Sequence, residues 1–156
     1  MPNSSNYIDL PDLIKYLHSF GFSLRLTCVC CKDMMDTVDK VEEFIKFAKE
    51  NKVEQVTLRP VNDEFRRKSA QEWIKENRLT DEQKIKMKKF LEEKGTKLLE
   101  LERIGTIYDV DGQNVCLSLP LNKNTRDTNP ENARNLIFFQ DGHIRYEWEM
   151  KGGILL

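Results

Sequence analysis

The sequence lacks the features that mark several large functional classes. It has no excess of either charge, because 25 lysines and arginines stand against 26 aspartates and glutamates. This balance argues against binding nucleic acid or a membrane surface through bulk charge. No apolar run approaches the length of a membrane span, and no Walker loop, GxGxxG segment or Ser-His-Asp pattern is present. We therefore expect no nucleic-acid partner, no membrane partner and no familiar nucleotide-binding or triad chemistry.

The amino terminus also lacks a secretory signal, since MPNSSNYIDL has no basic segment followed by an apolar one. Four cysteines in a chain without such a signal are expected to stay reduced. At 156 residues, of which 33% are charged, the chain is long enough to bury a core without disulfides or metal ions. We expect a soluble protein located in the cytoplasm.

The first 63 residues alternate between helical and extended patterns. The apolar spacing of YIDLPDLIKYLHSFGF predicts a helix capped by Gly21, and that of DTVDKVEEFIKFAKEN predicts a second helix. Residues 22–31 and the segment VEQVTLRPV, which ends at Pro60, have the pattern of strands. A strand–helix–strand crossover of this length makes a parallel pair. We therefore predict an α/β protein.

Helices and then hairpins are predicted for the remainder. One helix covers roughly 65–77, and a second begins where Thr80 and Gln83 match a capping box and stops at Gly95. The side chains expected to face the core are Phe65, Trp73, Ile74, Ile85, Phe90 and Leu91. TKLLELE, GTIYDV, NVCLSL and RNLIFFQDGHIRYEW read as strands, with hairpin turns at Asp111-Gly112 and Asp141-Gly142.

This pattern predicts three segments that form one compact unit. Residues 1–63 are a partial (β/α) barrel segment, 64–95 a helical segment and 96–156 a β-hairpin cap. The cap includes a polar loop, PLNKNTRDTNPEN, of a length typical of functional loops.

The two parallel strands carry polar side chains on one face. Alternation places the apolar residues of both strands toward the crossover helix and leaves a polar set on the other side. That set is Arg25, Thr27, Gln55, Thr57 and Arg59. A polar second face fits the lumen of a barrel, where two arginines would suit an anionic ligand. It also fits a sheet edge that meets water, and the residues alone do not separate these two interpretations.

Three cysteines occur within the four residues from Cys28 to Cys31. Alternation directs Cys28 and Cys30 toward the helix and Cys31 to the polar face, so a strand does not gather them around one metal. Free cysteine is among the most buried residue types. We therefore interpret Cys28 and Cys30 as apolar packing and predict no metal site. Zinc binding by these three and Cys116 is the alternative.

The segment HSFGFSLRLTCVCCKDMMDTVDKVEEFIKFAKENKVEQVTLRPV resembles the fifth strand, following helix and sixth strand of radical S-adenosylmethionine (radical SAM) enzymes, in particular the group of the GTP cyclase of molybdopterin synthesis. NARNLIFFQDGHIRYEW resembles their C-terminal hairpin. Arg25 falls where that cyclase has a phosphate-contacting lysine, Thr27 where it has an asparagine, and Arg59 on an arginine. The resemblance implies a partial (β/α) barrel with a polar lumen.

The Cys-x3-Cys-x2-Cys motif that binds the four-iron cluster in this family is absent, as is its Gly-Gly-Glu segment. The resemblance thus implies the C-terminal portion of such an enzyme, lining the substrate and adenosyl cavity but inactive alone. S-adenosylmethionine and a 4Fe-4S cluster are implied for the intact family and no cofactor for this chain. Its expected partner is the missing N-terminal barrel half, or a second copy through an open strand edge. The alternative is a non-catalytic α/β module that binds a ligand or partner.

Overall fold

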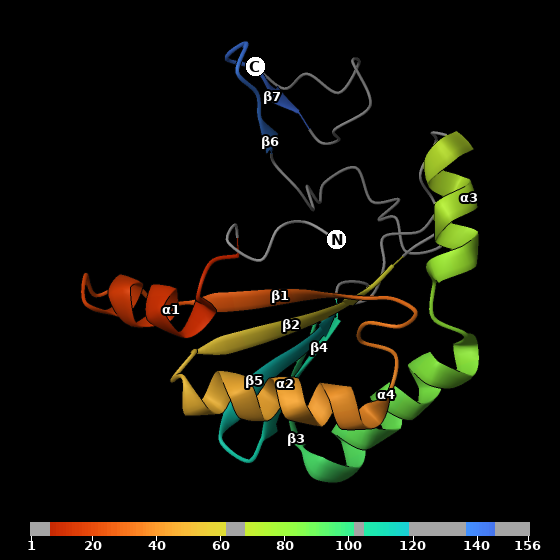
Figure 1. Cartoon of the computed structure of the whole chain (residues 1–156), viewed down its shortest axis with the longest axis horizontal. Coiled ribbons are helices and arrows are strands. Elements are labelled where there is room, and N and C mark those ends of the chain that lie inside the picture. The colour runs from red at the N-terminus through yellow and green to blue at the C-terminus, as the bar shows by residue number, and fades with distance from the viewer. Residues whose placement is uncertain (1–6, 62–67, 102–104, 119–136, 146–156) are drawn as a thin grey trace. The chain divides into compact units, whose positions relative to one another are not determined.

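The computed structural model describes residues 7–61, 68–101, 105–118 and 137–145. They fall into two units, one within Met1–Lys123 and the other within Asn124–Leu156. The described part of the first unit is a mixed α/β structure with four helices and an open five-stranded sheet, and that of the second is a short hairpin (Figure 1). No helix among these residues is both long and apolar enough to cross a membrane.

The first unit begins with the predicted alternation of helices and strands. Its elements in chain order are α1 (Leu10–His18), β1 (Arg25–Cys30), α2 (Val38–Glu50), β2 (Gln55–Pro60), α3 (Lys68–Asn77), α4 (Asp81–Lys94), β3 (Thr96–Leu101), β4 (Gly105–Val110) and β5 (Gln113–Ser118).

The five strands lie in the order β1-β2-β5-β4-β3. β1 pairs with β2 in parallel, which confirms the predicted strand–helix–strand crossover. β5 pairs in parallel with the other side of β2, and β4 and β3 continue the sheet in antiparallel fashion. β2 is therefore an inner strand, flanked by chain segments that lie far apart in the sequence.

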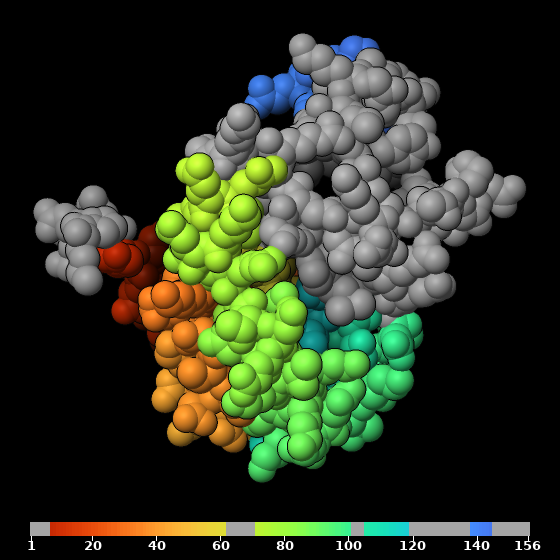
Figure 2. All heavy atoms as spheres, turned by 90° about the vertical axis from the view of Figure 1, so that its right-hand side faces the viewer, coloured from red at the N-terminus to blue at the C-terminus, as the bar shows by residue number. Residues whose placement is uncertain are grey.

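The core lies between the sheet and the helices α2 and α4. Figure 1 shows α2 running across the sheet beside β5. α2 contributes Val41, Ile45 and Ala48, and β2 contributes Val56 and Leu58, all buried. These are the apolar faces expected to meet. α4 lies against α2 (Figure 2) and buries Met87, Phe90 and Leu91.

Local signals in the sequence account for the helix ends. Asp9 caps α1, Thr37 caps α2, and Thr80 with Gln83 forms the predicted capping box of α4. Each cap satisfies backbone N–H groups that would otherwise have no partner at the helix start. Gly21 has a φ of 78°, which a residue with a side chain adopts at a cost in free energy.

Two predicted core residues are exposed in the structure. Trp73 is 51% exposed and Ile85 is 65% exposed, whereas Ile74, next to Trp73, is 3% exposed. Ile85 stands two positions before the buried Met87, and two residues turn a helix by about 200°. Ile85 therefore lies on the outer side of α4. The predicted core residue Phe65 lies outside the described residues.

Both predicted hairpins form. β4 and β5 are joined at Asp111 and Gly112, whose φ values of 50° and 82° fit the tight turn that connects twisted strands. In the second unit, β6 (Ile137–Phe138) pairs with β7 (Ile144–Arg145), with Gly142 at a φ of 83°. The predicted polar loop between these hairpins lies outside the described residues.

Candidate functional site

The five predicted site residues lie on one side of the sheet. Arg25 pairs with Gln55, Thr27 with Thr57, and Val29 with Arg59. Side chains of paired positions project to the same face. This face is opposite to the one on which Val56 and Leu58 pack against the helices. The structure thus brings the predicted residues together along β1 and β2.

The pairing of β5 with β2 adds two residues that the sequence did not reveal. Asn114 pairs with Gln55, and Cys116 pairs with Thr57. We call the seven residues the polar face: Arg25, Thr27, Gln55, Thr57, Arg59, Asn114 and Cys116. No local signal links β5 to β2, since the two strands are separated by two helices and two other strands.

Thr57 is the buried centre of the polar face. Its residue is 9% exposed, and its Oγ1 atom is buried without a hydrogen-bond partner in the described part of the chain. A buried hydroxyl left without a partner costs roughly 1–3 kcal/mol. A ligand that offers this hydroxyl a hydrogen bond would recover that free energy.

The amide side chains of Gln55 and Asn114 lie at one end of the polar face. Gln55 Nε2 donates to Asn114 Oδ1 over 2.7 Å, so the two side chains hold each other in position across neighbouring strands. On the next strand, β4, Asp109 pairs with Asn114. Its Oδ1 accepts the backbone N–H of Gly112. The carboxylate is therefore engaged in the β4–β5 turn.

Arg25 and Arg59 place positive charge at the two ends of the polar face. Both side chains are exposed. Arg25 pairs with Gln55, and Arg59 follows Gln55 by four residues, which is about 13 Å along a strand. Burial raises the pKa of the Cys116 thiol, and the charges of Arg25 and Arg59 both lower it. The middle of the polar face therefore lies within the field of both guanidinium groups.

The cysteines of β1 lie mainly on the helix side. Cys30 is fully buried and Cys28 half-buried, as the interpretation of apolar packing required. Cys31 was expected on the polar face. The strand ends at Cys30, so alternation no longer applies to Cys31, which is 5% exposed. Among the described residues, which include all four cysteines, no group of three possible ligands is placed to hold a metal ion.

A contact that the sequence did not indicate fixes the start of β1. Glu54 Oε2 accepts the backbone N–H of Leu24 over 2.7 Å and lies 3.3 Å from His18 Nε2. The hydrogen bond from Leu24 has the largest effect and lowers the pKa of the Glu54 carboxyl. Burial raises this pKa by less, and the contact with His18 lowers it further. This carboxylate, which directly precedes β2, connects the end of α1 to the start of β1.

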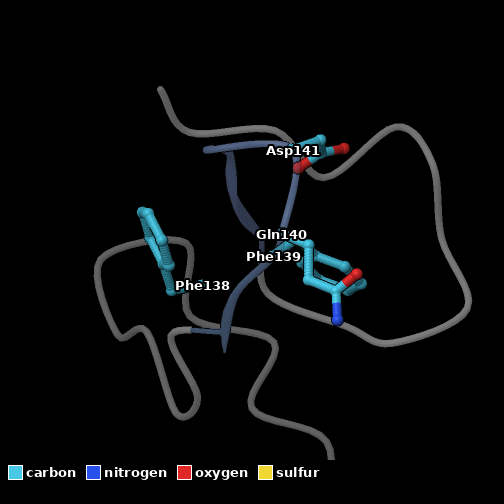
Figure 3. A pocket seen from close by; sticks show the side chains of 4 residues that line it. All are labelled: Phe138, Phe139, Gln140 and Asp141. Carbon is cyan, nitrogen blue, oxygen red and sulfur yellow. The ribbon is translucent and has the colours of Figure 1, made fainter.

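The second unit has a hollow of about 440 Å³ lined by Phe138, Phe139, Gln140 and Asp141. Phe138 lies on one side of the hairpin, with Phe139 and Gln140 on the other (Figure 3). Asp141 Oδ1 accepts the backbone N–H of His143 across the turn. These side chains do not converge on a common point, so the hollow does not form a chemical site.

Comparison of the chain with protein-family models, with curated proteins and with solved structures finds no significant match.

Proposed function

We propose that the polar face binds an anionic ligand, as part of the cavity wall in a radical SAM-type enzyme of which this chain is the C-terminal portion. In this proposal β1 and β2 are the fifth and sixth strands of a partial (β/α) barrel. The observation that carries it is the buried, unpartnered hydroxyl of Thr57 within the field of two arginines on one face of a parallel pair. Guanidinium groups bind carboxylate and phosphate through paired hydrogen bonds.

The cysteines of this chain do not suit the four-iron cluster of that family. Such a cluster needs several thiolates that converge. Cys28 and Cys30 instead belong to the core on the helix side of β1, and Cys116 lies on the polar face. In our proposal the cluster and the radical chemistry therefore depend on residues outside this chain, which on its own binds a ligand without transforming it.

The binding proposal is tested by calorimetric titration with pyrophosphate, a compact anion with several acceptor oxygens. We expect Arg25→Gln and Arg59→Gln each to weaken binding by about ten-fold or more, because each removes charge-assisted hydrogen bonds. Thr57→Val should also weaken binding, since it removes the unpartnered hydroxyl.

Arg78→Gln is the matched control, because Arg78 lies between α3 and α4 and not on the sheet. Its affinity for pyrophosphate should equal that of the wild type. Unchanged binding in both Arg25→Gln and Arg59→Gln, or an equal loss in Arg78→Gln, would refute the assignment of the polar face.

A second candidate function is a self-contained α/β binding module without catalysis. It is favoured by the pairing of β5 with β2, which gives the first unit a continuous sheet and a core from its own residues. A reading frame upstream that encodes a Cys-x3-Cys-x2-Cys segment would favour the enzyme portion, whereas an unrelated upstream gene would favour the module.

A further inference from the structure

β1 is an edge strand whose outer backbone groups have no neighbour among the described strands. The carbonyls of Leu24 and Cys30 accept hydrogen bonds from the β2 side, from Gln55 N over 3.2 Å and Val61 N over 3.0 Å. In a parallel ladder, alternate residues bond to the same neighbour. The residues between these positions therefore direct their N–H and C=O groups outward, and they are Arg25, Thr27 and Val29.

Among the described residues, the opposite edge of the sheet has features that prevent strand pairing and the β1 edge does not. β3 has a register shift between Lys97 and Leu99. The Lys97 ammonium group also forms an ion pair with the Glu100 carboxylate over 2.8 Å. Bulges and charged side chains are the usual means by which proteins prevent pairing at an exposed edge. β1 pairs regularly along its length, and Arg25 is its only charged residue. Of the two edges, only β1 is suited to accept another strand.

Apolar side chains near this edge are incompletely covered. Leu26 and Cys28 are half-buried, whereas their partners in register, Val56 and Leu58, are fully buried. Val29, on the other side of β1, is 50% exposed. The packing that buries the side chains of β2 therefore buries those of β1 only in part. A further strand beside β1 would bury them more completely.

We infer that β1 is a dimerisation edge, at which two copies of this chain pair their β1 strands antiparallel about a two-fold axis at Thr27. In this register Arg25 stands opposite the partner's Val29, and every outward N–H of these residues meets an outward C=O. The two Arg25 positions lie four residues apart, about 13 Å, so their repulsion is largely screened at physiological salt. Leu26 then lies beside the partner's Cys28 and gains apolar cover.

The pairing of two β1 strands does not depend on the proposed function. Two isolated chains join at this edge, whereas in a complete barrel the same edge would take the preceding strand. The pyrophosphate test stays distinguishable, since Thr57 and Arg59 lie on β2 and not at the β1 edge, and that test measures affinity whereas the dimer test measures mass.

Sedimentation equilibrium of the full chain over a wide concentration range tests the inference. We expect the wild type to reach the mass of a dimer and Val29→Lys to weaken association by about ten-fold or more, because the lysine charge must be desolvated at the paired edge. The matched control is Leu98→Lys on β3, where Leu98 is 55% exposed, and it should leave association unchanged. Circular dichroism checks that each variant folds.

Hydrogen exchange gives an independent measurement on the wild type. The amides of Thr27 and Val29 should become more protected as the protein concentration rises. Four results would each overturn the inference. The wild type could stay monomeric, Leu98→Lys could lose association as much as Val29→Lys does, or Val29→Lys could associate fully. The fourth is an exchange rate at Thr27 and Val29 that does not change with protein concentration.

Discussion

Cys28 and Cys30 differ in chemistry although they share one side of β1. A hydrogen bond from the Cys30 thiol lowers the pKa of Cys28 from 9.0 to about 7, while burial opposes this effect. The same hydrogen bond and burial raise the pKa of Cys30. Since the thiolate is the reactive form, the two thiols should react at very different rates near neutral pH.

We predict that Cys28 is the single fast-reacting thiol of the native chain. Its rate with a small alkylating reagent should rise between about pH 6 and pH 8, as the thiolate forms through its pKa. Cys30, Cys31 and Cys116 should react slowly. The hydrogen bond with Cys28 and then burial raise the pKa of Cys30, and burial raises the pKa of Cys31 and Cys116. Mass spectrometry of partially labelled protein identifies the site. Cys28→Ser should abolish the fast phase and Cys116→Ser should retain it, and the opposite pattern would contradict the prediction.

The sequence revealed the faces of individual residues better than their burial. Alternation assigned Arg25 and Arg59 to one side because a strand repeats every two residues, whatever its neighbours are. The burial of Thr57 could not be read in this way. Thr57 lies on an inner strand because β5 pairs with β2, and that pairing is long-range.

At the scale of the elements, the β4–β5 ladder depends on a glycine with no room for a side chain. Gly105 pairs with Ser118, and a Cβ atom added to it would lie less than 2.5 Å from the carbonyl oxygen of Leu117. That oxygen belongs to the backbone of the neighbouring strand, so it cannot move aside as a flexible side chain would. The strand that carries Cys116 is thus held close to β4 at this position.

We predict that Gly105→Ala lowers the free energy of unfolding by about 2–3 kcal/mol, because the added methyl group forces the two strands apart. Gly112→Ala is the comparison, since a Cβ there meets nothing within 4 Å and the only strain is its φ of 82°. We expect that variant to lose about 1 kcal/mol. Urea unfolding of both variants measures the difference, and a larger loss in Gly112→Ala would contradict the steric account.

Helices and hairpins were predictable because their signals are local. Thr80 with Gln83, and Asp111 with Gly112, mark a helix start and a turn within four residues or fewer. Trp73 and Ile85 were assigned to the core wrongly, because an apolar residue on a helix does not by itself reveal which side the sheet covers.

At the scale of the whole molecule, the sequence indicated an α/β protein but not the order of its strands. The insertion of β2 between β1 and β5 joins residues about 60 positions apart, such as Gln55 and Asn114. Short-range patterns contain no information about such pairing. The arrangement is also what places Cys116 beside Thr57 on the polar face.

We also predict the metal content of the whole chain. After anaerobic incubation with iron and sulfide, the purified chain should hold no stoichiometric cluster, because its described thiols do not converge on one point. Iron and sulfide analysis and the visible spectrum provide the measurement. A stoichiometric cluster with charge-transfer absorbance would refute this expectation, whereas pyrophosphate binding is a separate question.

The unequal protection of the two sheet edges limits how far assembly can go. In the proposed dimer, pairing at β1 uses the edge of each five-stranded sheet that lacks protecting features among the described residues. Both outer edges of the joined sheet are then β3, with its register shift and its Lys97–Glu100 ion pair. Growth by further strand addition stops there. We therefore expect strand pairing to stop at the dimer and not to extend into fibres.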